Sequence, residues 1–393
     1  MPRLLAVWRR GRKGPQRGPR PPADGLTPQE LAEVAGAVER LSHGLTRDRR
    51  LAGARYLDDE RLLGAYLLFY WPVSYLQARG VLSELPAPPR TVLDLGSGPG
   101  PMALAALDAG AALVTAADRS ERALAAARSL AEAAGKKLAT RRWDGARAQP
   151  LAELCGAARP DAVTLGHVLN ELGSGESALE ARAALLGDAA RLVAPGGSVV
   201  VVEPALRETS RALLAVRDRL VAGGLAVRAP CLFRGPCPAL SKESDWCHAE
   251  RPVEPPAVVA EIAAAAGLRR EAVKMSYLVL APPGEPWAEP PPGRVFRIVS
   301  EPLPGKGRLR YMGCGPEGRM GLALQEKHVG DANRRFGALL RGDVVEVSEV
   351  EPRGDGLRLG PGSTVRVLAG AGSPLPPGGG GPQVGGATGG GPG

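Results

Sequence analysis

The sequence predicts an α/β protein built on a doubly wound, mostly parallel sheet, with smaller regions on either side. Between residues 85 and 282, short apolar runs alternate with alanine- and leucine-rich stretches whose apolar positions recur at helical spacing. The first apolar run ends in a glycine-rich loop that leads directly into such a helical stretch. Strands that alternate with helices through short connections form a parallel sheet covered by helices. The chain has 393 residues, which is enough for this domain and a second, smaller one.

The strands of this domain are expected in order along the chain, separated by helices. They are the runs at 91–96, 113–118, 139–144, 161–172, 196–204 and 275–282. Ligands of such sheets bind beyond the carboxyl ends of the strands, where the strand order reverses. The loops that follow the strands are therefore the expected place of a site.

A basic, flexible arm is expected at residues 1–24. Its first 22 residues carry seven lysine or arginine residues and no acidic residue, in a chain whose net charge is +9. Glycine and proline are interleaved with these charges, so we expect no amphipathic helix beyond the first turns. Such an arm suits contact with nucleic-acid phosphates, and a solubilising tail is an equal alternative. A mitochondrial transit peptide is a weaker alternative, because it would need the amphipathic helix.

A helical cap is expected at residues 25–84. Thr27, Pro28 and Glu30 form a strong helix start. The later part of the cap holds much of the aromatic content of the chain, at Tyr66, Phe69, Tyr70, Trp71 and Tyr75. We expect these rings to pack the cap against the next domain. The alternative is that some of them line a substrate pocket.

Three regions follow the α/β domain. Residues 283–293 are proline-rich and are expected to form a linker, and residues 294–370 contain short strand-like runs between glycine turns, typical of a small β-domain. Between residues 294 and 341 there are ten lysine or arginine residues against four acidic ones, so this domain is locally basic. Residues 371–393 are almost entirely small residues and proline, and we expect them to be disordered.

Hydropathy and cysteine content bear on the cellular setting. No apolar run approaches the roughly 18 residues that a membrane-spanning helix needs, so we expect no membrane association. The five cysteines are an odd number and no secretory signal is evident, which argues against a disulfide framework. We therefore expect a soluble, cytoplasmic protein. The sequence does not determine the oligomeric state, and a monomer is favoured.

The run VLDLGSGPG at 92–100 is the strongest candidate for a ligand-binding loop. Its strand ends in Asp94, and Gly96, Gly98 and Gly100 follow. Glycines let the backbone turn sharply and approach a ligand without a Cβ in the way. Asp94 can accept hydrogen bonds from an amino group of the ligand, or it can hold the loop.

Two further acids close the next two strands. Asp118 ends the second strand, where a carboxylate can accept both hydroxyls of a ribose, and Asp144 ends the third, within reach of an adenine amino group. Acids at the ends of three successive strands favour S-adenosylmethionine as the ligand. The GxGxxG spacing of a dinucleotide site is missing. A dinucleotide site and an α/β domain that has lost its ligand are the alternatives.

This pattern resembles class I methyltransferases over about residues 85–282. The resemblance implies that the three glycines of the loop cradle the methionine end of S-adenosylmethionine. It also implies that Asp118 holds the ribose and that Asp144 lies near the adenine.

Catalytic residues are not assigned from the sequence. The fourth strand ends in GHVLNEL, which offers His167, Asn170 and Glu171. Methyl transfer from a sulfonium needs alignment and a nucleophile more than acid–base groups. The chain lacks the Asn/Asp-Pro-Pro-aromatic run of many amide- and adenine-methylating enzymes, and a cysteine suited to pyrimidine C5 chemistry. His167 is equally well explained as a packed strand-end residue.

The cysteines are clustered. Three fall within 17 residues and a fourth lies in the β-domain, at Cys231, Cys237, Cys247 and Cys314. Thiolates grouped in this way bind soft metal centres. Their irregular spacing, with prolines alongside, suits a [4Fe–4S] cluster that would fasten the β-domain to a cysteine-rich insertion at 230–250. Zinc is one alternative, with His248 as a ligand if Cys314 is not one. The other alternative is that none of the four cysteines binds metal.

Four segments together resemble one methyltransferase-like family. They are LDLGSGPG, HVLNEL, CLFRGPCPALSKESDWCH and RIVSEPLPGKGRLRYMGC, within about residues 60–345. The family is that of the mitochondrial small ribosomal subunit methyltransferase-like assembly factor, which has bacterial members. The resemblance implies binding to the small ribosomal subunit and its rRNA, and four cysteine ligands for an iron–sulfur cluster.

Three functions are therefore weighed. The first is an S-adenosylmethionine-binding, iron–sulfur methyltransferase-like protein that acts on or binds small-subunit ribosomal RNA in ribosome assembly or translation. The second is a non-catalytic RNA-binding assembly factor on the same scaffold, and the third is a zinc-containing methyltransferase of another substrate. Basic residues of the β-domain are candidate phosphate contacts, namely Lys306, Arg308, Arg310, Arg334 and Arg335.

Overall fold

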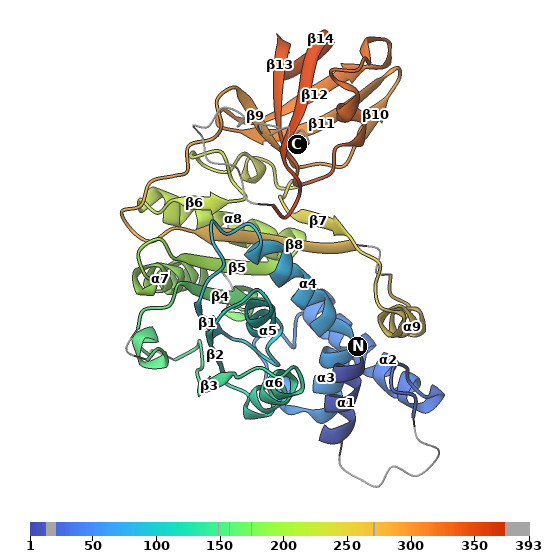
Figure 1. Ribbon diagram of the computed structural model, residues 1–393, viewed down its shortest axis with the longest axis vertical. Helices are drawn as coiled ribbons and strands as arrows, with labels where there is room; N and C mark the ends of the chain where they lie inside the picture. The colour runs from blue at the N-terminus through green and yellow to red at the C-terminus, as the bar shows by residue number, and fades with distance from the viewer. Residues whose placement is uncertain (13–20, 148, 157, 174, 270–271, 374–393) are drawn as a thin grey trace, which may run out of the picture.

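The computed structural model describes residues 1–12, 21–147, 149–156, 158–173, 175–269 and 272–373 (Figure 1). An α/β domain occupies the middle of the molecule, a β-domain lies at one end, and helices of the cap lie at the other (Figure 1). Within the described residues, no helix is both long and apolar enough to cross a membrane.

The central sheet has the predicted doubly wound character. Its strands are β1 (Thr91–Leu95), β2 (Leu113–Asp118), β3 (Ala139–Arg142), β4 (Ala162–Gly166), β5 (Ser198–Pro204), β6 (Val227–Ala229), β7 (Ala249–Pro252) and β8 (Ala272–Leu280). The order is β3-β2-β1-β4-β5-β8-β6, with β7 also paired to β8. Strands β1 to β5 are parallel, and β8 runs antiparallel to β5. The strand order reverses between β1 and β4, which is where such sheets bind ligands.

Helices cover both faces of this sheet. Along β5, Val200 and Val202 belong to one buried cluster, and Val199 and Val201 belong to another. This alternation arises because successive side chains of a strand point to opposite faces. The first cluster includes residues of α4 (Trp71–Leu82), α5 (Pro101–Asp108) and α6 (Glu121–Ala133). The second includes residues of α7 (Glu176–Leu192) and α8 (Arg207–Ala222).

The expectation of a flexible arm is wrong for residues 2–11, which form helix α1 (Pro2–Gly11). Four apolar side chains of this helix are buried in the cap, at Leu4, Leu5, Val7 and Trp8. Arg9 forms an ion pair with Glu30, at 2.8 Å between Nη2 and Oε2. Burial of this apolar face stabilises the helix despite its many charges. One of these charges, on Arg9, takes part in an ion pair within the protein. Residues 13–20 of the predicted arm lie outside the described residues.

The cap consists of short helical segments. They are α2 (Pro28–Ser42), η1 (His43–Arg47), η2 (Tyr56–Asp58), α3 (Glu60–Ala65), η3 (Tyr66–Tyr70) and α4. Helix α2 begins at the predicted start, where Thr27 and Glu30 form a capping box. Segments η1 and η3 are π-helical, a rare geometry that is frequent at functional sites. Helix α9 (Ala257–Ala265) packs against the same cluster as the cap.

The β-domain is a six-stranded sheet with its own core. Its strands are β9 (Arg294–Ile298), β10 (Leu303–Gly305), β11 (Arg308–Gly315), β12 (Gly318–Gln325), β13 (Val344–Arg353) and β14 (Gly356–Ala369). Tyr311 and Phe336 meet edge to face in this core, with ring centroids 5.1 Å apart. The described residues end at 373, so most of the tail that was predicted to be disordered, 374–393, lies outside them.

A buried polar network joins the cap, the central sheet and the β-domain. The Glu84 side chain, which follows α4 and is 2% exposed, accepts hydrogen bonds of 2.8 Å from the Tyr277 hydroxyl of β8. It also pairs with Arg297 of β9 at 3.4 Å and Arg251 of β7 at 3.2 Å. In the predicted linker, Glu285 pairs with Arg228. The β-domain is therefore anchored to the α/β domain by charge pairs as well as by the chain itself.

Candidate cofactor cavity and cysteine group

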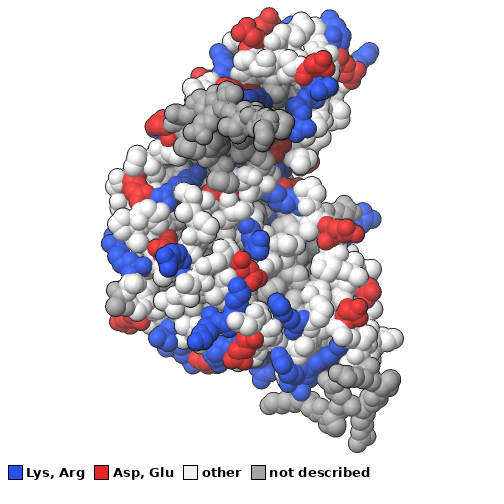
Figure 2. Space-filling view, in the orientation of Figure 1, with Lys and Arg blue, Asp and Glu red and all other residues white. Residues whose placement is uncertain are grey.

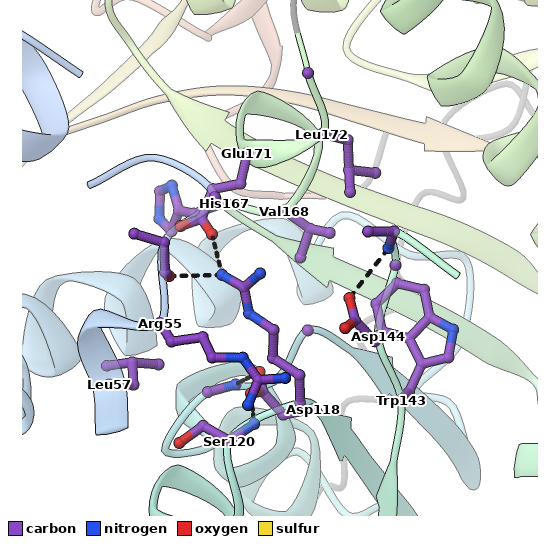
Figure 3. Close-up of a pocket in the computed structure, with 18 of the residues that line it drawn as sticks. Arg55, Leu57, Asp118, Ser120, Trp143, Asp144, His167, Val168, Glu171 and Leu172 are labelled. Atoms are coloured by element: carbon purple, nitrogen blue, oxygen red, sulfur yellow. Dashed lines mark hydrogen bonds and ion pairs between the residues drawn. The ribbon is translucent and has the colours of Figure 1, made fainter. Parts of the chain in front are cut away.

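A cavity of about 470 Å³ lies at the carboxyl ends of β1, β2 and β4. His167, Val168 and Glu171 lie at one end of it, opposite Asp118 and Ser120, while Trp143 and Asp144 form one side (Figure 3). The cap supplies a further wall through residues 53–57. The sequence did not point to this cap segment, because its residues carry no recognisable motif.

Two glycines of the predicted loop line the cavity. Gly96 has φ +64°, and a Cβ added there would lie 2.4 Å from Val168 Cγ2. Gly98 has φ +51° and also lines the cavity. Gly100 instead packs against α6, where an added Cβ would lie 3.0 Å from that of Ala127. The loop therefore needs glycine both for its backbone conformation and for the space that a side chain would fill.

Asp94 holds the loop, which is one of the two roles expected for it. Its carboxylate accepts a hydrogen bond from Thr164 Oγ1 at 2.7 Å and from the Ala103 backbone N–H at 3.1 Å. Burial raises the pKa of Asp94 to about 7. The side chain thus joins β1, β4 and the first turn of α5 beneath the glycine loop.

Asp118 faces the cavity from the end of β2. Its two oxygens accept the backbone N–H groups of Gly98 and Ser120, each at 2.8 Å. Burial raises the pKa of this carboxyl, and these two hydrogen bonds act against the rise. Because each carboxylate oxygen can accept more than one hydrogen bond, Asp118 can still receive hydroxyl groups from a ligand.

Asp144 also lines the cavity, although β3 ends two residues before it, at Arg142. Its Oδ1 accepts the Ala146 backbone N–H at 3.2 Å. The neighbouring Trp143 is 4% exposed and presents part of its ring to the cavity. Sequence reasoning missed Trp143, whose flat apolar surface suits a planar ring beside the Asp144 carboxylate.

His167 and Glu171 form the end of the cavity nearest the cap. His167 has φ +61°, a conformation that costs a non-glycine residue energy and occurs often at functional sites. Its Nε2 lies 2.9 Å from Gln77 Oε1. Burial raises the pKa of Glu171 to about 7, while Arg119, at 3.6 Å, acts against that rise. Tyr56 donates a hydrogen bond to Glu171 at 3.2 Å.

Asn170, the third candidate of this strand end, supports the backbone. Its Nδ2 donates to the His167 carbonyl at 2.9 Å, and its Oδ1 accepts from Arg49 at 3.0 Å. Glu203 at the end of β5 accepts the backbone N–H groups of Leu169 at 2.8 Å and Asn170 at 3.2 Å. These bonds fix the turn after β4 that places His167.

The four cysteines of the predicted metal site come from two domains that the fold brings together. Three lie between β6 and β7, and Cys314 lies on β11 opposite Arg319 of β12. Arg319 forms an ion pair with Asp245, two residues before Cys247, which places the insertion beside β12, the partner of β11. Burial raises the pKa of Cys314, and the charges of the other three thiols raise it further.

Arg217 of α8 holds the loop between Cys231 and Cys237 in place. This buried guanidinium donates to the carbonyls of Phe233 and Gly235, and it pairs with Asp218. Asp218 in turn accepts the Cys237 backbone N–H at 2.8 Å. Across the described residues, no three histidine, cysteine or acidic side chains form a group that could hold a metal ion.

The predicted phosphate contacts are all exposed on the β-domain. Lys306 lies in the turn between β10 and β11, and Arg308 and Arg310 lie on β11. Arg334 and Arg335 begin η8 (Arg334–Ala338), and Arg334 pairs with Asp331 at 3.3 Å. Figure 2 shows lysine and arginine side chains both at the β-domain end and at the opposite end around α1 and α6.

The glycine loop and Asp118 thus meet at one cavity where the strand order reverses, and the strand order is that of the class I methyltransferase fold. The particular family is shown by a family model described as mitochondrial small ribosomal subunit Rsm22, which matches residues 64–346. The chain therefore belongs to the Rsm22 family, and the predicted resemblance is confirmed.

Solved structures give looser likenesses. TrmN from Thermus thermophilus is 22% identical over 55% of this chain and 53% of its own, with a TM-score of 0.35. An O-methyltransferase family protein from Burkholderia thailandensis is 18% identical over 72% of this chain and 83% of its own, with a TM-score of 0.37. The chain thus spans about half the length of the Thermus protein. Among curated proteins, no relative matches significantly.

Proposed function

We propose that this protein binds S-adenosylmethionine in the cavity beyond β1, β2 and β4, and that it acts on or binds small-subunit ribosomal RNA. The observation that carries the proposal is the meeting of the glycine loop, Asp118 and Asp144 around one cavity at the strand-order reversal. The link to the small ribosomal subunit is supported by membership in the Rsm22 family.

The residues present fit the cofactor. The backbone at Gly96 and Gly98 leaves room for the methionine end, Asp118 would take the ribose hydroxyls, and Trp143 with Asp144 would receive the adenine. When bound, the cofactor would supply a methyl group, carried on a sulfonium, for transfer to an acceptor. The chain itself orients the two reactants and keeps water from the reacting atoms.

Calorimetric titration with S-adenosylmethionine tests this part. Wild type should bind one equivalent, and Asp118→Ala should bind at least about a hundredfold more weakly, because two hydrogen bonds to a charged acceptor are lost. Asp108→Ala is the matched control, since this acid lies at the end of α5 and bonds to Tyr75. Absence of heat in wild type would refute the proposed cofactor.

We further propose that Cys231, Cys237, Cys247 and Cys314 hold a [4Fe–4S] cluster that fastens the β-domain to the insertion. Support comes from a donor set made of cysteine sulfur and from the Arg319–Asp245 ion pair, which holds the insertion beside the strand pair that carries Cys314. Iron and acid-labile sulfide, measured on protein purified without oxygen, should both be close to about four per chain. One zinc per chain would instead favour the zinc-containing alternative.

The second candidate function is a non-catalytic RNA-binding assembly factor. The exposed basic side chains of the β10–β11 hairpin favour RNA binding under either reading. The open cavity lined by Asp118 and Asp144 favours the methyltransferase-like function, because a scaffold without a ligand needs neither an open cavity nor acids that face it. Transfer of a labelled methyl group to small-subunit ribosomal RNA separates the two.

A further inference from the structure

A second cavity, of about 440 Å³, lies beside the cofactor cavity and has no assigned role. The two cavities share four lining residues, namely Tyr56, Tyr66, His167 and Glu171. The second one extends beyond β5 and the start of β8, beneath the cap. A molecule in it would meet a ligand of the first cavity across this shared wall, so the pair has the layout of a donor site and an acceptor site.

Aromatic rings form the cap side of the second cavity. Tyr66 and Tyr70 lie with ring centroids 5.9 Å apart and an interplanar angle of 28°, and both line the cavity. The end of β5 and the loop after it supply an apolar wall of Pro204, Ala205 and Leu206. Aromatic and apolar surfaces of this kind suit a flat ring, which gains by stacking.

Unusual backbone is concentrated around this cavity. Segments η1 and η3, both π-helical, supply lining residues, including Thr46 and Tyr70. His167, with its positive φ, stands in the shared wall. Gln77 fixes the His167 ring, because its amide also donates to the Lys274 carbonyl at 2.8 Å. Backbone of this type is kept where surrounding structure and function require it.

Cations lie among the lining residues from β8 and the turn before it. Lys274 and Arg269 are there, and Lys274 pairs with Glu250 at 2.9 Å. Glu250 also lines the cavity and neutralises Lys274, so Arg269 is the cation that would meet a phosphate of an unpaired nucleotide while its base entered between the aromatic and apolar walls. Enzymes that act on a base take it out of the helical stack into such a pocket.

We propose that the second cavity binds one unpaired nucleobase of an RNA strand and holds it against the shared wall as the methyl acceptor. This inference rests on the proposed function, since it names the acceptor class of the same site. Tyr70 is the residue to change, because it lines the second cavity whereas Tyr66 lines both.

The test compares two fluorescein-labelled oligoribonucleotides on the full-length protein, one with its bases and one with a single abasic position. Tyr70→Ala should weaken binding of the first about 5- to 150-fold and leave the second unchanged. Tyr70→Phe, which keeps the ring, should retain wild-type binding. Tyr75→Ala is the matched control, because this tyrosine of α4 points to Asp108 of α5. Ala205→Trp, which fills the cavity from its other wall, should act like Tyr70→Ala.

Calorimetry with S-adenosylmethionine on the same variants separates the two claims. If the cofactor binds normally while neither Tyr70→Ala nor Ala205→Trp reduces the preference for the base, the acceptor pocket is refuted and the proposed function stands. Equal weakening by Tyr75→Ala would also refute the pocket. If wild type binds no cofactor, the proposed function fails first, whatever the RNA result.

Discussion

Replacing Gly96 with alanine tests whether the glycine loop is shaped for the cavity. The added Cβ would lie 2.4 Å from Val168 Cγ2, and Gly96 has φ +64°. The left-handed conformation alone costs an alanine about 1–2 kcal/mol. Displacing Val168 adds about 1–3 kcal/mol, typical of overpacking. Gly96→Ala should therefore reduce the free energy of unfolding by about 2–5 kcal/mol.

Gly135→Ala is the matched control for this substitution. Gly135 has φ +68°, and nothing lies within 4 Å of its added Cβ. It should lose only the conformational part, about 1–2 kcal/mol, and should bind S-adenosylmethionine like wild type. Gly96→Ala should bind the cofactor more weakly, because Val168 lines the cavity and must move.

A double variant isolates the contact itself. Val168→Ala removes two methyl groups and should cost about 1.6 kcal/mol by lost burial. In the double variant, Val168→Ala opens space for the Cβ that Gly96→Ala adds. The loss of stability of the double variant should therefore be about 1–3 kcal/mol smaller than the sum of the two single losses. Unfolding in denaturant, monitored by circular dichroism, measures all four proteins. Strict additivity, or equal losses in Gly96→Ala and Gly135→Ala, would refute the reasoning.

Three further predictions concern the domain junction, the buried carboxyls and the basic hairpin. Glu84→Gln leaves the buried Arg297 and the half-buried Arg251 without their shared counter-charge and should cost about 3–5 kcal/mol in denaturant unfolding. A loss below about 1 kcal/mol would contradict that role. Burial raises the pKa of Glu203 to about 7 from 4.5, so the folded protein holds this proton to higher pH than the unfolded chain and loses stability as pH rises between these values. The stability of Glu203→Gln relative to wild type should therefore rise by up to about 1.4 kcal/mol per pH unit in that window, whereas a constant difference would refute the assignment. Replacing both Arg308 and Arg310 with alanine should lower the slope of the logarithm of RNA affinity against the logarithm of salt concentration by about 2. Arg366→Ala is the control and should leave this slope unchanged, because the Arg366 guanidinium pairs with Glu346. An unchanged slope in the double variant would remove the hairpin from the RNA-binding surface.

The fold could be predicted where hydrophobic pattern and turn residues agree. Strands β1, β2 and β5 fall where the apolar runs predict them. Strands β6 and β7 were missed because they are three and four residues long and lie beside or within the cysteine-rich insertion. Strand β14 was missed because Gly360, Pro361 and Gly362 interrupt it, although the strand continues through them. Helix α1 was not predicted because its arginines lie on both sides of the apolar residues that form its buried face.

The site could be predicted only in part. Of the predicted residues, Gly96, Gly98, Asp118 and Asp144 line the cavity, because residue type and spacing at strand ends indicate such positions; Asp94 and Gly100 instead support the loop from behind. Trp143 and the wall at 53–57 were missed because only the tertiary fold brings them to the cavity. The positive φ of His167 and the π-helical turns are backbone properties that no motif records. Cys314 was linked to the insertion by residue type, and its place opposite Arg319 brings it there.

The most direct test of the account is a crystal structure of the protein grown with S-adenosylmethionine. The account predicts cofactor density over Gly96 and Gly98, with the ribose hydroxyls on Asp118 and the adenine beside Asp144. An empty cavity at saturating cofactor, or cofactor bound elsewhere, would contradict the central claim.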